Sequence, residues 1–498
     1  MKRLIQTYLS AFLFISSGLS AAETPPNIVF ILADDMGYGD VQSYNPERGK
    51  IPTPHMDQLV KEGMKFTDAH TTSSVCTPTR YGILTGRYNW RTHLQSHVLF
   101  GYSPPLISSE RATVASFLKE HNYHTACVGK WHLGMTLPTL NDSPITSEEN
   151  ATNIDWEGTI KNGPINVGFD YFYGISASLD MPPYIYLLND RFVGECTIEK
   201  TEFGREGAAH ADFKAVDVLP EIGNKSVAFI QEQKKEQPFF LYVPLTSPHA
   251  PIIPSKEWIG KSGLGEYGDF QMQTDSIIGQ IAKAVDDSEF AENTFLIVTS
   301  DNGCSRRANF KDLAKKGHYP NAQFRGAKSD LWDGGHRIPF IVRWPAKVKA
   351  NTTSNELICQ SDLMATCADI LGKDLAPQAG VDSESFLPAL LGKPIESKRK
   401  GLVHHSIDGH FSYRHGKWKL LLSRGSGGWT KPEEEVPEDN PKGQLYDMES
   451  DPSETTNLYL EKPEIVAKLL AFLENDVKRG RSTPGPDQTN DAKIKIWK

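Results

Sequence analysis

The feature that most constrains the fold of this chain is a set of short, almost uninterrupted apolar runs that alternate with helix-like segments. Four such runs occur, at residues 27–32, 239–243, 294–299 and 340–342. A strand with one face in water shows a polar residue at every second position, so uninterrupted apolar runs indicate strands buried on both faces. Amphipathic helical patterns follow or separate them, over 113–120, 269–285 and 362–371. The alternation predicts a mostly parallel sheet flanked by helices.

The pattern changes after about residue 400. Short segments at 411–414, 417–422 and 444–447 are typical of antiparallel strands, and 463–477 is typical of a terminal helix. A Gly/Pro/Glu-rich stretch over 425–443 indicates a long surface loop. The chain length of 498 residues allows roughly three domains of ordinary size. The pattern favours two, a large α/β domain over 23–395 and a smaller α+β domain over 396–498.

The N-terminus has the layout of a secretory signal peptide. Lys2 and Arg3 precede an apolar run over 9–19, and Ser20 and Ala22 are small residues placed for cleavage after residue 22. A transmembrane anchor needs about 20 apolar residues, and this run is shorter. We therefore expect 1–22 to be removed and the mature protein to be exported, periplasmic or secreted, without stable membrane insertion.

Charge and cysteine content exclude two further classes of protein. The net charge of −9 and the isoelectric point near 6.0 disfavour nucleic-acid binding, which selects clustered positive charge. The same charge also disfavours, taken alone, a polyanionic partner. Six cysteines are too few for a disulfide scaffold of this length. Besides Cys76 there are five, an odd number that cannot all pair: Cys127, Cys196, Cys304, Cys359 and Cys367.

Two acidic pairs directly follow predicted strands. Asp34-Asp35 ends the first run, and Asp301-Asn302 ends the run at 294–299. Ligands of open α/β sheets bind at the carboxyl ends of strands, where these pairs are expected to meet. Three carboxylates and an amide oxygen suit Ca²⁺ or Mg²⁺ rather than zinc. Each pair by itself is better explained as a helix or turn cap, and only the two pairs together, at matching positions of the sheet, indicate a metal site.

Cys76 lies in a small-residue loop that opens a predicted helix, with Arg80 one turn further on. A helix N-terminus beside a cationic side chain favours a thiolate or another anionic group. The alternative is an inert buried thiol, the usual state of a lone cysteine. The residues alone leave both interpretations open.

The segment Cys76-x-Pro-x-Arg80, followed by Thr85-Gly-Arg87, closely resembles the signature of the type I, formylglycine-dependent sulfatases. Other segments resemble landmarks of that family in the family's order, among them Gly129-Lys130-Trp-His132, Ser247-Pro-His249-x-Pro251, Arg325-Gly-x-Lys328, Gly334-Gly-His-Arg-Ile-Pro339 and Leu445-Tyr-Asp-x-x-x-Asp451-Pro-x-Glu454. The likeness covers most of the chain and includes secreted carbohydrate sulfatases and arylsulfatases. It implies an alkaline-phosphatase-like fold, with a large mixed, mostly parallel sheet and a smaller C-terminal antiparallel sheet plus helix.

The resemblance also implies the site residues. Maturation of Cys76 to 3-oxoalanine (formylglycine) would be performed by a formylglycine-generating enzyme or an anaerobic sulfatase-maturing enzyme. The implied ligands of one Ca²⁺ ion are Asp34, Asp35, Cys76, Asp301 and Asn302. The implied catalytic residues are Cys76, Arg80, Lys130, His132, His249 and Lys328.

In the implied mechanism, the hydrated aldehyde attacks sulfur while cationic groups neutralise the sulfate oxygens. His249, with Lys328, protonates the departing alcohol, and His132 removes the proton that releases sulfate.

The sequence constrains the identity of the substrate less than it constrains the reaction. Export and a polar pocket favour a sulfated polysaccharide or its oligosaccharides, either algal, such as ulvan or carrageenan, or glycosaminoglycan. Asp180, His318 and His405 are expected to bind this substrate. A turn cap for Asp180 and structural roles for the two histidines are equally compatible with the sequence. Two alternatives stay open: a phosphomonoester or phosphonate hydrolase of the same superfamily, and a non-catalytic protein that binds sulfated glycans.

Overall fold

The structure, a computed structural model, describes residues 24–141, 143–202, 204–431 and 440–498. The predicted signal peptide and part of the predicted loop at 425–443 lie outside the described residues. None of the described helices combines the length and the apolar character that crossing a membrane requires.

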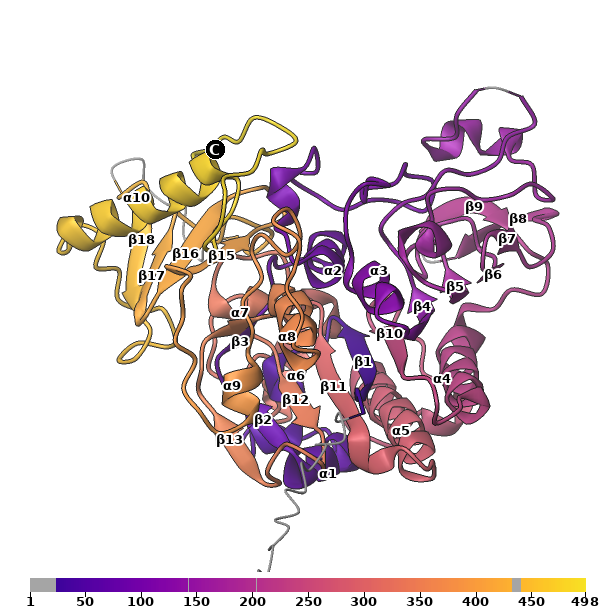
Figure 1. Ribbon diagram of the computed structural model, residues 1–498, viewed down its shortest axis with the longest axis horizontal. Coiled ribbons are helices and arrows are strands. Elements are labelled where there is room, and N and C mark those ends of the chain that lie inside the picture. The colour runs from indigo at the N-terminus through magenta and orange to yellow at the C-terminus, as the bar shows by residue number, and fades with distance from the viewer. Residues whose placement is uncertain (1–23, 142, 203, 432–439) are drawn as a thin grey trace, which may run out of the picture.

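A ten-stranded mixed sheet forms the centre of the molecule (Figure 1). In spatial order its strands are β13 (Thr352–Ser354), β2 (Met64–Phe66), β12 (Phe340–Arg343), β11 (Thr294–Ser300), β1 (Asn27–Asp34), β10 (Phe239–Pro248), β4 (His124–Lys130), β5 (Tyr171–Ile175), β6 (Leu187–Leu188) and β7 (Arg191–Phe192). The five strands from β11 to β5 are parallel. The predicted fold class is confirmed.

One predicted strand has the opposite direction to the parallel core. β12 pairs antiparallel with β11, Thr299 facing Phe340. No helix returns the chain along the sheet between these two strands, so residues 301–339 stay at the carboxyl end of β11. The consequence is functional, because this whole segment is available to build a site at that edge.

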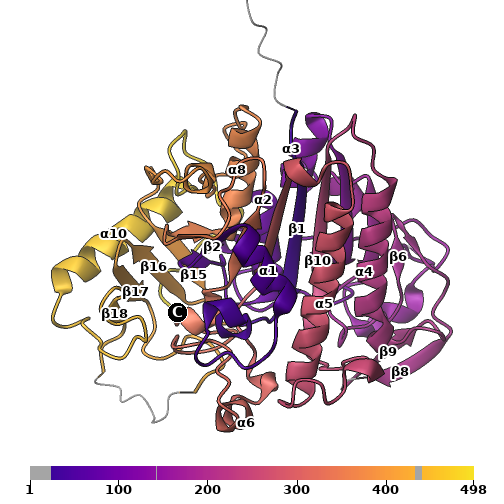
Figure 2. The same ribbon diagram turned by 90° about the horizontal axis from the view of Figure 1, so that it is seen from below.

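Helices cover both faces of the sheet. α1 (Pro54–Glu62), α4 (Ala215–Glu232) and α5 (Glu266–Asp286) lie along one face, which Figure 2 shows toward the viewer. α2 (Cys76–Thr85), α3 (Val114–Glu120) and α8 (Leu363–Ile370) cover the other face. Alternate residues of β1 enter the two cores: Val29 and Ile31 pack with the first group, and Ile28 and Phe30 with the second. Burial on both faces explains the uninterrupted apolar run.

The C-terminal region forms a separate four-stranded antiparallel sheet (Figure 1). Its strands are β15 (Leu402–His405), β16 (Phe411–His415), β17 (Trp418–Leu421) and β18 (Gln444–Asp447), packed against α10 (Pro463–Arg479). Tyr88 and Trp90, which follow α2, belong to the same apolar cluster. The C-terminal sheet is therefore joined to the segment that begins at Cys76.

The remaining described elements are small. They are β3 (Ala69–His70) paired with β14 (Ile358–Cys359), the hairpin β8 (Ile198–Glu202) and β9 (Arg205–Ala209), and the short helices α6 (Phe310–Lys315), α7 (Asp333–His336) and α9 (Leu387–Leu390).

Candidate active site

The sheet brings the predicted polar residues together at one edge. Asp34 ends β1, Asp301 follows β11, Lys130 ends β4 and His249 follows β10. These four strands are neighbours, and Ala33 faces Ser300 in the β1–β11 register. Residues more than 250 positions apart in sequence therefore meet because their strands are parallel and adjacent.

Cys76 enters the same space from the N-terminal turn of α2. Its side chain is buried, and the loop before it is held by the C-terminal sheet. The carbonyl of His405 accepts hydrogen bonds from the Ser73 hydroxyl, at 2.7 Å, and from the Ser74 backbone N–H, at 3.0 Å. Thr79 Oγ1 donates to the Ser73 carbonyl at 2.8 Å, which closes the loop onto the helix.

Buried cations neutralise the first carboxylates. Lys130 Nζ is 2.5 Å from Asp34 Oδ2, and Arg80 Nη2 contacts Asp34 Oδ2 at 3.2 Å and Asp301 Oδ2 at 2.8 Å. Burial alone would raise the pKa of Asp34, but Lys130 and the other nearby cations hold that pKa below its ordinary value. Burial and the charge of Asp34 instead raise the pKa of Asp301 to about 7. Desolvation and the neighbouring carboxylate thus outweigh the contact of Asp301 with Arg80.

A second set of contacts positions Asp35. Lys328 Nζ is 2.6 Å from Asp35 Oδ1, and Asn302 Nδ2 donates to the same oxygen at 2.8 Å. His249 Nε2 lies 3.8 Å from Asp35 Oδ2. Asp35 has a φ of +66°, a left-handed conformation that few non-glycine residues adopt and that turns its side chain away from the direction of β1. Such strain is characteristic of functional sites.

Two oxygens of the predicted metal ligands have no partner. Asp34 Oδ1 and Asn302 Oδ1 are buried and accept no hydrogen bond. An unsatisfied buried oxygen costs free energy unless another group compensates it. One ligand atom each from Asp34, Asp35, Cys76 and His249 also lies within 4.8 Å of the others. The oxygens of Asp34 and Asp35, with those of Asp301 and Asn302, fit a hard cation such as Ca²⁺, whereas the sulfur of Cys76 and the nitrogen of His249 are softer donors.

The two histidines of the site have defined tautomers. His132 Nε2 is 2.7 Å from the carbonyl of Leu99, so this nitrogen carries the proton, and the buried Nδ1 is left without a partner. Burial and the charge of Lys130 lower the pKa of His132 well below its ordinary value. His132 is therefore a neutral ring with a free lone pair, as a general base requires.

His249 donates from Nδ1 to the Ala250 carbonyl, which leaves Nε2 as an acceptor toward the cavity. Burial and the charge of Lys328 lower its pKa as well.

The thiol of Cys76 is not ionised. Burial raises its pKa to about 11, although Lys130 and Lys328 act in the opposite direction. Of the two interpretations that the sequence leaves open, the structure favours the un-ionised thiol for the unmodified residue, because desolvation outweighs the nearby cations. All six cysteines, which lie in the described part of the chain, are free.

A cavity of about 680 Å³ opens above this centre. Its lining includes four residues of this centre, Cys76, His132, His249 and Lys328. It also includes two exposed aromatic side chains, Phe100 and Trp429, which have 47% and 58% of their surfaces exposed. Sites for small molecules are of this size and combine apolar walls with a few polar groups.

The three predicted substrate-binding residues are not together. Asp180 lines the cavity and is paired with Arg205 Nη1 at 3.1 Å. His318 is fully buried between Asp40, at 2.8 Å, and the Lys50 backbone N–H, at 3.1 Å. His405 is also buried, and its backbone carbonyl supports the loop before Cys76. Neither His318 nor His405 is among the described residues that line the cavity, so the structure does not bring them together with Asp180.

Several residues of the cavity have no sequence signal. Ser178 joins the site, with Oγ 3.4 Å from Lys130 Nζ and 3.2 Å from His249 Nδ1. Arg205, Arg307 and Trp429 line the cavity from segments outside every motif. Only the tertiary structure brings them to the site.

Comparisons with known proteins agree with this geometry. A family model described as "Sulfatase" matches residues 26–373, and one described as "N-sulphoglucosamine sulphohydrolase, C-terminal" matches residues 327–481. The N-acetylgalactosamine-6-O-sulfatase of Bacteroides thetaiotaomicron is 35% identical, covering 90% of this chain and 93% of the relative. Human arylsulfatase A is 29% identical, covering 90% and 86%.

A solved sulfatase structure has the same fold. It was described with the metabolism of multiple glycosaminoglycans by Bacteroides thetaiotaomicron, and it superposes with a TM-score of 0.79 at 34% identity. The match covers 91% of this chain and 99% of that structure.

Proposed function

The chain belongs to the sulfatase family, and from this premise we propose that it removes sulfate from sulfated glycans through a formylglycine made from Cys76. The observation that carries the proposal is the centre itself. A buried cysteine with a raised pKa lies among Lys130, Lys328 and Arg80, beside a carboxylate oxygen and an amide oxygen that have no hydrogen-bond partner. Cations around a small anion site and unfilled metal ligands suit an ester of a strong oxyacid.

The proposed Ca²⁺ ion would be held by Asp34, Asp35, Asp301, Asn302 and the converted Cys76 side chain. When bound, this ion supplies positive charge to a sulfate oxygen and to the nucleophile. Asp34 Oδ1 and Asn302 Oδ1 are the oxygens that the ion would satisfy. Conversion of Cys76 supplies a hydrated aldehyde, whose hydroxyl is an oxygen nucleophile in place of the un-ionised thiol.

The chain's own residues then have distinct tasks. Lys130 and Lys328 offset the negative charge of the sulfate oxygens. Arg80 fixes the positions of the Asp34 and Asp301 carboxylates beside Cys76. His132 Nδ1 accepts the proton that accompanies sulfate release. His249 and Lys328 protonate the departing alcohol. Burial and the charge of Lys328 lower the pKa of His249, so its ring is neutral in the free protein; the negative charge of a bound substrate would raise that pKa and let the ring carry the proton that it donates.

For the substrate we propose a 6-O-sulfated N-acetylgalactosamine unit of a glycosaminoglycan. The support is the 35% identity to a relative of that name, together with the cavity. The Asp180–Arg205 pair provides a hydroxyl acceptor and donors, and Phe100 and Trp429 offer apolar surface for the faces of a sugar ring.

Sulfate release from a panel of saccharides tests this function. The panel contains N-acetylgalactosamine 6-sulfate, its 4-sulfate isomer, N-acetylglucosamine 6-sulfate and a carrageenan oligosaccharide, with a phosphate monoester as the control for the alternative activity. We expect release to be fastest from the first. Faster release of phosphate would overturn the reaction class, and saturable binding without turnover by converted protein would favour a glycan-binding protein.

Two further proposals concern export of the protein and maturation of Cys76. The segment 1–22 would direct export to the periplasm or the exterior, and a formylglycine-generating or anaerobic sulfatase-maturing enzyme would act on Cys76. Mature N-terminal sequencing of the exported protein tests the first, with residue 23 as the expected start.

A further inference from the structure

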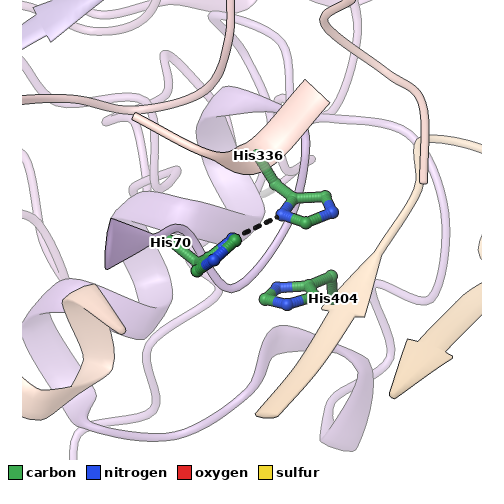
Figure 3. Close-up of side chains that lie close together, drawn as sticks. All are labelled: His70, His336 and His404. Atoms are coloured by element: carbon green, nitrogen blue, oxygen red, sulfur yellow. Dashed lines mark hydrogen bonds between the residues drawn. The ribbon is translucent and has the colours of Figure 1, made fainter. Parts of the chain in front are cut away.

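Three histidines meet in the interior, away from the cavity. His70 lies on β3, His336 ends α7 and His404 lies on β15, and each is at most 1% exposed (Figure 3). One ring nitrogen of each lies within 4.8 Å of the others. The rings of His336 and His404 are stacked, with centroids 3.8 Å apart. None of these rings takes part in the proposed reaction.

The partners of each ring determine where its proton lies. His70 Nε2 is 2.8 Å from Asp68 Oδ1. His336 Nε2 is 2.9 Å from the Leu331 carbonyl, and His404 Nδ1 is 3.1 Å from the Thr71 carbonyl. Carboxylate and carbonyl oxygens only accept, so each ring donates its one proton outward.

The inner nitrogens are therefore bare. His70 Nδ1 and His336 Nδ1 face each other at 3.0 Å, with a lone pair on each. His404 Nε2 is buried and has no hydrogen-bond partner. Facing lone pairs repel, and an unpaired buried nitrogen costs free energy, so this arrangement of nitrogens suits a group that accepts electron pairs.

An additional proton on one ring would also join the two facing nitrogens. The surroundings do not favour such an imidazolium, because the carboxylates nearby are already paired. Asp333 contacts Lys419 at 2.7 Å and Arg337 at 3.2 Å, and Asp68 contacts Arg414 at 3.2 Å. Burial, moreover, lowers the pKa of all three histidines.

We propose that His70, His336 and His404 bind a first-row transition-metal ion, with Zn²⁺ as the representative case, at a site distinct from the proposed Ca²⁺ centre. Three neutral imidazoles suit such an ion and not Ca²⁺. Two nitrogens at 2.0–2.1 Å from one zinc are about 3.3 Å apart at the tetrahedral angle, close to the observed 3.0 Å. An outward N–H held by an oxygen acceptor is the usual second contact of a metal-bound histidine. Binding requires the His404 ring to tilt out of its stack with His336.

The position of the site gives the ion a structural role. It joins β3 and α7 of the large unit to β15 of the C-terminal sheet. His70 directly precedes the loop 71–75, and the Thr71 carbonyl already accepts from His404. A bound ion would therefore fix the loop that presents Cys76, and would stabilise the contact between the two sheets.

Metal content and thermal stability of the full-length protein test the site. Chelator-treated protein is incubated with Zn²⁺ in the presence of excess Ca²⁺, which occupies the oxygen-rich centre, and bound zinc is measured by mass spectrometry of the elements. We expect about one zinc ion per chain and a higher Tm that Ca²⁺ alone does not restore. Co²⁺ in place of Zn²⁺ should give the visible absorption of a nitrogen-ligated ion.

Paired variants locate the ion. His336→Gln and His404→Gln should lose the zinc, whereas His249→Gln, at the cavity, and His121→Gln, at the end of α3, should retain it. The proposal is overturned if the wild-type protein binds no zinc and gives no Co²⁺ absorption, or if zinc is lost with His249→Gln and kept with His336→Gln. Neither result bears on sulfate release, so the proposed function is tested separately.

Discussion

At the scale of single residues, the chemistry depends on side chains held in forms that burial imposes. Cys76 is a neutral thiol with a pKa of about 11, and His132 is a neutral ring with an unpartnered Nδ1. A thiol of this kind is a poor nucleophile at neutral pH. This environment supports the proposal that Cys76 is converted to an oxygen nucleophile and that His132 accepts a proton.

His132→Gln tests that assignment. Glutamine can still donate to the Leu99 carbonyl, but it offers no basic nitrogen toward the cavity. We expect kcat to fall by about 10²- to 10⁴-fold, with a much smaller change in KM. His121→Gln, far from the cavity, is the control and should leave both constants unchanged. A kcat within threefold of wild type for His132→Gln would remove His132 from the mechanism.

Sequence motifs predicted residues whose position follows from local structure. The positions of Asp34 and Asp301 in the site are predictable because each lies at the end of a largely apolar strand. That of Cys76 is predictable because its signature is local. The sequence does not decide between a binding and a structural role for His318 and His405, because a histidine that lines a cavity and a buried one have the same sequence pattern. Arg205 and Trp429 lie in the cavity through long-range packing, for which the sequence has no periodic or motif signal.

At the scale of elements, the parallel strands place the polar residues at their carboxyl ends in one centre. Because oxygens in this centre have no hydrogen-bond partner, we predict that the stability of the protein depends on Ca²⁺. We expect removal of Ca²⁺ to lower the Tm, with a loss of about 2.7 kcal/mol relative to protein at 100 times the Kd. Differential scanning calorimetry with and without a chelator measures this. Asp34→Asn should abolish the response to Ca²⁺. A wild-type Tm that does not change with Ca²⁺ would contradict the metal assignment.

A second element-scale contact ties the segment after α2 to the C-terminal region. Arg91 and Asp382 form a fully buried ion pair at 2.8 Å, and Asp382 also accepts from the Ser482 backbone N–H at 3.0 Å. Removing one partner leaves an uncompensated buried charge. Asp382→Ala should therefore lower the free energy of unfolding in urea by about 3–5 kcal/mol.

The matched control for this pair is Asp287→Ala, which breaks the exposed Lys283–Asp287 contact and should change stability by less than about 0.5 kcal/mol. The Asp382 effect also depends on pH. Burial opposes ionisation, but Arg91 and hydrogen bonds hold the pKa of Asp382 below its ordinary value. Its contribution is thus present above the unfolded-state pKa and is lost as pH falls below it. Equal losses for both variants would show that the buried pair is not stabilising.

Secondary structure was predictable where periodicity was strong. β1, β11 and α5 agree with their predicted ranges because each is long and buried in a regular pattern. The direction of β12 was not predictable, because an apolar run is the same in a parallel and in an antiparallel strand. β12 is antiparallel to β11 because no crossover helix lies between the two strands. β15 escaped prediction because two of its four residues are His404 and His405, which do not resemble a strand.

At the scale of the whole molecule, the central sheet and the C-terminal sheet are joined by buried contacts near the site. We propose the division at 395/396, with the second unit acting as a support for the nucleophile loop. Lys419 of β17 contacts Asp333 at 2.7 Å and Glu454 at 2.8 Å, and His405 holds Ser73 and Ser74. The contacts that fix Cys76 thus come from both units.

A chain ending at residue 395 tests this dependence. We expect it to be insoluble or to release no sulfate, because Asp333 would lose its buried partner and the loop before Cys76 its hydrogen-bond acceptor. Circular dichroism and sulfate release measure the outcome. A soluble truncated protein with wild-type kcat would show that the C-terminal unit is dispensable.

The net charge of −9 is also best understood at this scale. Global charge argues against an anionic partner, yet the cavity gathers Lys328, Arg205 and Arg307, with Lys130 and Arg80 behind it. Binding of a sulfate group is decided by these local charges and the proposed metal, within a surface that is acidic on average.

The central claim is that sulfate release depends on a converted Cys76. The most direct measurement is the rate of sulfate release from N-acetylgalactosamine 6-sulfate by protein produced with and without a maturing enzyme, alongside the mass of the peptide containing Cys76. We predict a rate proportional to the fraction of peptide in which the CH₂–SH group has become CHO, and none for Cys76→Ala. A rate that is independent of that fraction, or retained in Cys76→Ala, would contradict the account.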